Sequence, residues 1–292
     1  MQLLSFVQSL MSAPAVTTAL LIGSLVAVVS GAVGVFVVLR GQSFAGHALG
    51  DIGATGAAAA FLSGVEPLYG FLGIGLLGGL AIEGLGERAR ERDIATGIVL
   101  SLMLGVGALL LFFTTQRTSA TGGPVAILFG SIFTVNPAVL TPVAAFSLLA
   151  LALLALIYRP LIFASVSAQV ARARGVPLRW IGVLFVLALA IAVEESSLVA
   201  GALLSTALLI GPAAAAVRWA RHVGHAIVLA ALLGVAAVVL GIALAYQSYF
   251  WPPVHRGWPV SFFIVMLVLL EYLVSRIGRR RARARVAARE AA

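Results

Sequence analysis

The stretch GSLVAVVSGAVGVFVVLRGQSFAGHALGDIGATGAAAAF, residues 23–61, holds two long apolar runs joined by one short polar turn at Arg40. With the apolar residues that flank it, the first run covers about residues 15–39 and the second about 43–63. A helix crosses the hydrocarbon core of a bilayer in about 20 residues, so each run is long enough to cross it. The stretch therefore predicts a pair of membrane-spanning helices.

The rest of the chain repeats this pattern. Of its 292 residues, 62% are hydrophobic and 10% are charged, whereas about a quarter of the residues in a soluble domain are charged. Further candidate spans cover residues 68–86, 94–113, 137–158, 180–195, 197–217, 224–247 and 259–276. Because only Glu-Glu-Ser-Ser separates the span 180–195 from the next, the count is eight or nine. We predict an all-α, polytopic helical membrane protein over residues 1–277.

The charges predict the orientation of these spans. All 19 basic residues are arginine, and a nine-span topology places 17 of them on one side and only Arg117 and Arg256 on the other. Arginine-rich loops stay in the cytoplasm, so the C-terminus is expected there and the N-terminus outside. Residues 278–292 form a basic cytoplasmic tail that we expect to be disordered. The short apolar segment 124–135 is expected to be re-entrant or interfacial.

The composition also excludes several classes. The arginines are not interleaved with aromatic residues as in a nucleic-acid binder, so the lipid membrane, and no nucleic acid, is the expected partner of these charges. Cysteine is absent, which excludes disulfides and thiolate metal sites.

One predicted span carries a polar stripe. Ser43, His47, Asp51 and Thr55 recur at every fourth residue and share one face of a helix. The neighbouring row holds only small residues, which are Gly46, Gly50, Ala54 and Ala58. An ionisable group at membrane depth costs roughly 2.5–3.5 kcal/mol on insertion scales, so it normally faces a partner or a pathway.

Three interpretations of His47 and Asp51 remain open on the residues alone. They can form a helix-to-helix hydrogen bond, a proton relay, or a transient site for a divalent metal. An imidazole and a carboxylate on one face suit Mn, Fe or Zn. The surrounding glycines fit two structures, a discontinuous helix beside a substrate site or a close helix–helix contact.

Glu194 and Glu195 form the second acidic feature inside the predicted membrane region. The predicted topology puts them near the outer face, where they are either a solvated turn between two spans or an acidic vestibule that attracts cations. Because they are adjacent in sequence, their side chains point in different directions on a helix. Both residues, like Ser43 and Thr55, are candidates for lining a pathway.

The chain does not resemble an enzyme. Ser43, His47 and Asp51 could be proposed as a catalytic set, but no oxyanion-hole or nucleophile-elbow motif accompanies them. The sequence has no P-loop of the form GxxxxGK[ST] and no lysine at all, so we do not expect it to hydrolyse ATP. No permanently bound cofactor is expected.

Several stretches in one order resemble a known family. They are GAVGVFVVLRGQSFAGHALGDIGATGAAAAF, RDIATGIVLSLMLGVGALLL, GPVAILFGSI, FASVSAQVARARGVPLRWIG and LVAGALLSTALLIGPAAAA. In this order they resemble the ABC-3 permeases, the membrane subunits of bacterial importers for manganese, zinc or iron, over roughly residues 23–220. The resemblance implies an ABC-3 type fold, a transported divalent metal, and a place in the bacterial plasma membrane.

The resemblance also implies roles for particular residues. The family pattern resembles SxxGDAxSHAxxPG, whose Asp and His line the metal path, and SFAGHALGDIGATG here carries His47 and Asp51 in exchanged order, with Thr55 in place of the proline. The family stretch FDPxxAxxxGxP docks on the ATPase, and Ala171, Gly175 and Pro177 match it here, whereas Ser165 stands near the acidic position.

The resemblance therefore implies three partners, which are a cytoplasmic ATP-binding subunit, an extracytoplasmic metal-binding protein and a second copy of the chain in a homodimer. Two other functions stay open. A permease for a metal complex of the siderophore or cobalamin type would share this plan without needing the His/Asp stripe. A proton-coupled secondary transporter would need no ATPase.

Overall fold

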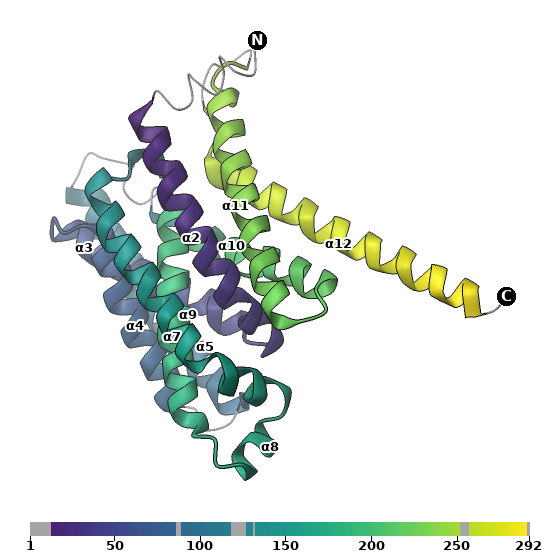
Figure 1. The fold of residues 1–292 in the computed structure, drawn as a ribbon. Coiled ribbons are helices and arrows are strands. Elements are labelled where there is room, and N and C mark those ends of the chain that lie inside the picture. The colour runs from purple at the N-terminus through teal and green to yellow at the C-terminus, as the bar shows by residue number, and fades with distance from the viewer. Residues whose placement is uncertain (1–12, 86–88, 118–126, 131, 252–256, 291–292) are drawn as a thin grey trace.

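The protein is a bundle of helices (Figure 1). The computed structural model describes residues 13–85, 89–117, 127–130, 132–251 and 257–290. The long helices are α2 Pro14–Leu39, α3 Ser43–Leu62, α4 Pro67–Leu85, α5 Ala89–Arg117, α7 Leu140–Val166, α9 Leu178–Ala200, α10 Ala202–Trp219, α11 Val223–Ser248 and α12 Val260–Glu290. Three short pieces join them, η1 Ile132–Thr134, η2 Pro137–Val139 and α8 Ala168–Ala173. No strand occurs in the described part, and the predicted all-α class is confirmed.

The number of long helices agrees with the predicted eight or nine spans. Within the described ranges, seven helices are long and apolar enough to cross a membrane. Helix α10 offers a shorter apolar stretch, Leu204–Trp219, and α3 carries the polar stripe. The division of the chain at residue 277 stays a prediction. Helix α12 continues past this position to Glu290, and Figure 1 shows it leaving the bundle.

The boundary between the sixth and seventh predicted spans is wrong. Glu-Glu-Ser-Ser lies inside α9, which continues to Ala200, and Gly201 alone joins α9 to α10. Gly201 has φ 85°, a left-handed conformation that glycine adopts without strain. Gly130, from the predicted re-entrant segment, packs against this joint so closely that neither glycine has room for a side chain.

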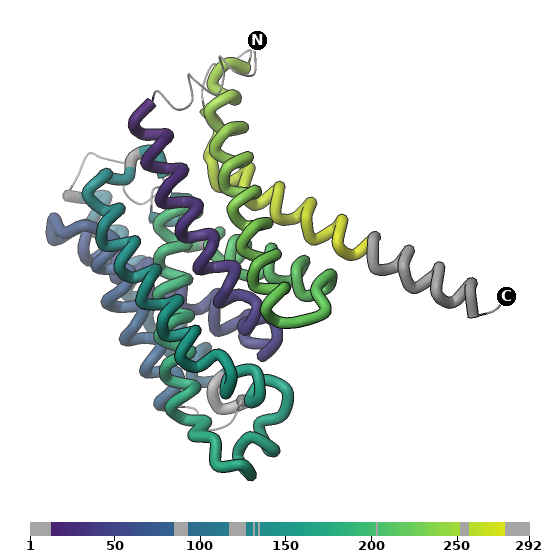
Figure 2. The backbone as a smooth tube through the Cα atoms, viewed as in Figure 1, coloured from purple at the N-terminus to yellow at the C-terminus, as the bar shows by residue number. Residues whose placement is uncertain are grey.

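Helix α2 is the central element of the bundle, with α11, α10, α7 and α9 packed around it (Figure 2). Its side chains from Val29 to Val37 are all buried. Phe36 makes edge-to-face contacts with Tyr158 of α7 and Phe185 of α9, with ring centroids 6.0 and 6.5 Å apart. Such pairs contribute about 0.5–1.5 kcal/mol each beyond the burial of their area. These contacts hold α7 and α9 against α2, and α9 in turn packs against α3.

Helix α3 packs against α4 through glycine. A β-carbon on Gly56 would overlap the carbonyl of Gly70, and one on Gly70 would overlap the carbonyl of Gly56. The two backbones therefore touch directly, as small residues allow in membrane helices. Helix α3 is continuous from Ser43 to Leu62, so the expected close packing is confirmed and the expected discontinuous helix is wrong.

The close contact of α3 with α4 predicts a sharp difference between two glycines of α4. Gly70→Val forces a side chain into the backbone of α3, and overpacking destabilises by about 1–3 kcal/mol or more. Gly73→Val, one turn further, meets open space and carries the same change in helix propensity. We expect a lower melting temperature in detergent for Gly70→Val only, and equal melting of the two variants would contradict the contact.

Candidate functional site

Helix α3 presents its polar stripe to a partly open surface. Ser43, His47 and Asp51 are each half-buried, while Thr55 is 5% exposed. The Thr55 hydroxyl donates a 2.7 Å hydrogen bond to the carbonyl of Met103 on α5. The structure thus separates the stripe into an open part, formed by the first three residues, and a closed end held by α5.

His47 and Asp51 come together on this open part. His47 Nε2 lies 3.7 Å from Asp51 Oδ2, and the two side chains are 44% and 12% exposed. The spacing of four residues predicts this pairing, because such residues lie one above the other on a helix. The exchanged order of the two ligand types leaves a nitrogen and a carboxylate on the same face, the combination that suits Mn, Fe or Zn.

The row of small residues brings a third polar group to this pair. Gly46 and Gly50 let α10 approach so closely that a β-carbon on Gly50 would lie 2.8 Å from Ser205 Oγ. The next residue of α10, Thr206, places its Oγ1 3.1 Å from His47 Nδ1. Thr206 was not predicted from the sequence. The one feature that marks it there is a hydroxyl side chain within an apolar run. A partner on the second ring nitrogen orients a metal-binding histidine.

The structure places Glu194 and Glu195 in the bundle interior, so the expected solvated turn is wrong. Both side chains have 0% exposure within α9. Glu195 faces α7, where its Oε2 accepts a 2.8 Å hydrogen bond from Ser147. Glu194 faces the other way, toward Gly53 of α3 and Gly75 of α4. Helical geometry explains this divergence, because adjacent residues point about 100° apart.

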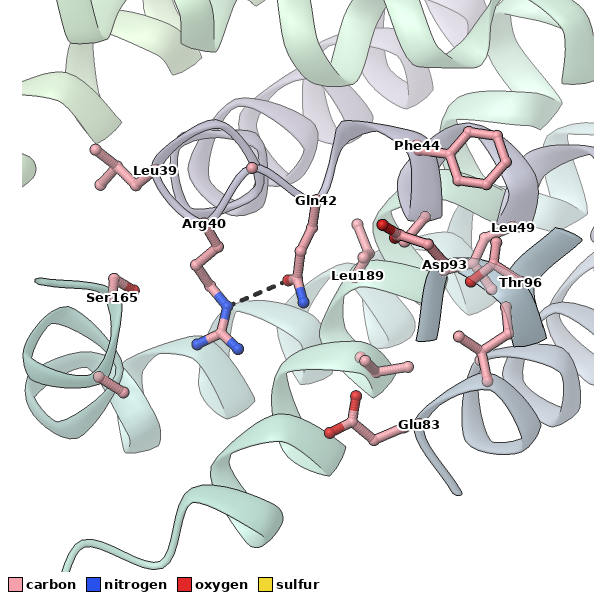
Figure 3. A pocket seen from close by; sticks show the side chains of 16 residues that line it. Leu39, Arg40, Gln42, Phe44, Leu49, Glu83, Asp93, Thr96, Ser165 and Leu189 are labelled. Atoms are coloured by element: carbon pink, nitrogen blue, oxygen red, sulfur yellow. Dashed lines mark hydrogen bonds between the residues drawn. The ribbon is translucent and has the colours of Figure 1, made fainter. Parts of the chain in front are cut away.

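A cavity of about 300 Å³ opens where α2, α4, α5 and α7 end or begin. Figure 3 shows Arg40 and Gln42 joined by a 3.2 Å hydrogen bond, with Glu83 and Asp93 coming in from α4 and α5. Ser165 of α7 lines the same cavity. Segments predicted to be cytoplasmic therefore gather at one end of the bundle.

The predicted ATPase-docking segment forms the short helix α8 and the turn after it. Ser167 caps α8 by accepting from Val170 N at 3.4 Å, and Gly175 ends it with φ 75°. Ala171 is fully buried, so it packs inward, and Pro177 precedes α9. Gly175 and Pro177 are exposed. The large apolar side chains exposed around them, Val166, Val170 and Trp180, are 83%, 47% and 69% exposed and were not predicted from the sequence.

Few possible metal ligands lie around His47 and Asp51. Over the described residues, no three His, Cys, Asp or Glu side chains converge where they could hold a metal ion. A four-coordinate transition metal would need further ligands beyond His47 and Asp51.

Comparison with known proteins identifies the family. Residues 12–274 match the model of the ABC 3 transport family. The manganese transport system membrane protein MntC of Listeria monocytogenes is 27% identical over 82% of this chain and 85% of its own length. The manganese import system permease protein ScaB of Streptococcus parasanguinis is 30% identical over 80% of this chain and 81% of its own length.

A solved structure agrees with this assignment. The structure of PsaBC from Streptococcus pneumoniae in complex with Fab superposes with a TM-score of 0.73 and 27% identity, covering 94% of this chain and 95% of that one. The family model covers most of the chain, and the resemblance expected from the ordered motifs is confirmed. The chain belongs to the ABC 3 transport family and is a multi-pass membrane permease.

Proposed function

We propose that the chain is the membrane subunit of an ATP-driven importer that carries a divalent transition metal ion, with manganese preferred over zinc or iron. The observation that carries the proposal is the His47–Asp51 pair, partly open on α3 with a Nε2–Oδ2 distance of 3.7 Å. Relatives named for manganese transport and import support the choice of metal. Ser43 would line the same path, and Thr55 would close it toward α5.

A second copy of the chain would complete the site. Each copy offers one imidazole nitrogen and one carboxylate, and a two-fold axis beside the exposed His47 side chain would bring four ligands together. Ligands shared between two copies separate when the copies move apart, which allows the ion to leave. Conduction requires such a balance between binding and release.

The energy source lies in a separate subunit. The sequence has no P-loop, and the surface around α8 offers exposed apolar side chains next to arginines at the predicted cytoplasmic end. An ATP-binding subunit would dock there, and an extracytoplasmic metal-binding protein would deliver the ion at the opposite end. The complex would sit in the bacterial plasma membrane with the C-terminus of this chain in the cytoplasm.

The metal pair predicts loss of transport in single variants. His47→Ala and Asp51→Ala each remove one of two ligands, so we expect manganese uptake by the reconstituted complex to fall about tenfold or more. Ser63→Ala, at the end of the same helix with a hydroxyl that bonds only locally to Ala59, serves as the control. Normal uptake by both ligand variants would refute the site.

The Thr206 contact predicts an effect on metal affinity. Thr206→Val keeps the shape of the side chain but removes the partner of His47 Nδ1. Loss of the hydrogen-bond partner of a metal-binding histidine weakens metal affinity about 10–100-fold. Thr206→Ser keeps the hydroxyl and should behave as the wild type. Metal titration of the purified complex measures this, and equal affinities of the two variants would remove Thr206 from the site.

The surface of α8 predicts which residues hold the ATPase. Val170→Asp puts a charge on the exposed apolar surface, and we expect loss of the ATP-binding subunit during co-purification. Val65→Asp, 49% exposed in the turn between α3 and α4, carries the same change elsewhere and should retain it. Retention by Val170→Asp, together with normal metal-stimulated ATP hydrolysis, would place the docking surface elsewhere.

A further inference from the structure

The turn between α10 and α11 carries two histidines that the proposed pathway does not use. Only residues 220–222 separate the two helices. His222 is the last of them, and His225 lies in the first turn of α11. Both side chains are exposed, at the end of the bundle that the predicted topology places in the cytoplasm. Neither imidazole makes a hydrogen bond or an ion pair within the described part of the chain, so no neighbour there occupies their nitrogens.

The start of α11 brings the two rings together. His222 is the N-cap residue, with extended backbone at φ −133° and ψ 149°, and its side chain does not cap the helix. His225 is the third residue of the helix. Side chains at these two positions reach toward each other in a capping box, where each bonds the other's backbone. Here two imidazoles take these places, and their ring centroids lie 5.6 Å apart with the planes at 57°.

This separation fits a metal ion held between the rings. Zinc binds an imidazole nitrogen at about 2.0–2.1 Å, which puts the ion about 3.2 Å from the centre of the ring. Two such rings at a tetrahedral angle have their centres about 5.3 Å apart, close to the 5.6 Å observed. Because both side chains are exposed, rotation about their side-chain bonds turns one nitrogen of each ring toward a shared ion. Water would fill the other positions, since no third ligand side chain converges with the pair in the described residues.

The arginines beside the turn do not occupy this position. The Arg218 guanidinium is held by α12, where it donates a 3.1 Å hydrogen bond to the Tyr272 hydroxyl and lies 5.0 Å from the centre of that ring. Arg221 is exposed, so water and salt screen its charge. The repulsion that remains acts on every cation, and a bond to nitrogen compensates for it. The turn therefore favours ions that bind imidazole over ions that are attracted by charge alone.

We propose that His222 and His225 form a second transition-metal site, which takes zinc or copper and binds manganese much more weakly. Imidazole suits zinc, copper and nickel, whereas manganese suits oxygen ligands and stands lowest in the order of divalent affinities. The pair offers two nitrogens and no carboxylate, so its metal preference differs from that of the His47–Asp51 pair. The inference does not rest on the proposed function, because the two rings bind metal whether or not the chain transports it.

The test is a zinc chloride titration of the purified protein in detergent, followed by calorimetry, with no polyhistidine tag present. Every sample carries His47→Ala, which removes the imidazole of the pathway. His222→Asn and His225→Gln each remove one ring and suit their places, because Asn is a good N-cap and Gln a good helix former. We expect each of them to bind one zinc ion fewer per chain. A manganese chloride titration should give the same result for all samples.

Arg221→Ala is the matched control, because it changes an exposed side chain of the same turn that is not a ligand. It should keep the bound zinc. Electron paramagnetic resonance of added copper(II) reads the ligands directly. We expect coupling to two imidazole nitrogens in the sample with both histidines, and to one nitrogen in His222→Asn and in His225→Gln.

Unchanged zinc binding in both histidine variants would overturn the inference. Loss in only one of them would also overturn it, because the ion would then belong to a single histidine. Loss in Arg221→Ala as well would assign zinc binding to the structure of the turn instead of the two rings. A copper spectrum with one nitrogen throughout would leave the histidines with a ring contact only. None of these measurements uses transport, so the uptake test of His47 and Asp51 is decided separately.

Discussion

Direct contact between helix backbones is the constraint on which the site depends. Helix α3 touches α4 where Gly56 meets Gly70, and α10 approaches it over Gly46 and Gly50. Without side chains at these points, neighbouring polar groups come within reach of the stripe. His47 meets Thr206 only because α10 lies this close. In a bilayer, where lipid is as apolar as leucine, such close packing and polar contacts replace the hydrophobic force that holds soluble bundles together.

The same packing explains how the bundle tolerates acidic side chains. Glu195 is held by Ser147 of α7, whereas Glu194 lies in a slot between Gly53 and Gly75. The two residues have the same chemistry and the same burial, and only their neighbours differ. The Glu195 carboxylate accepts a hydrogen bond from Ser147, whereas the Glu194 carboxylate has no hydrogen-bond partner among the described residues.

Sequence patterns predicted the helices and the His47–Asp51 pair, because both follow from local periodicity. The limits of α9 could not be predicted in this way. Four polar residues in an apolar region indicate a turn, yet the helix continues through them because tertiary partners, such as Ser147 for Glu195, satisfy part of the set. Thr206 was missed for the same reason, since its importance depends on a contact 159 positions away in sequence. Periodicity reports which face a residue occupies, and it does not report which helix lies opposite.

The partial exposure of the His47–Asp51 pair favours transport over metal storage or a structural metal site as its proposed role. A structural metal site encloses its ion with four ligands from one chain, and ligand exchange is then slow. Here a single copy offers two ligands, with the His47 side chain 44% exposed. In the proposed homodimer, the additional ligands would come from the same pair on the second copy. A site completed only by moving parts binds its ion in one conformation and loses ligands in the other, and alternating access requires this difference in affinity.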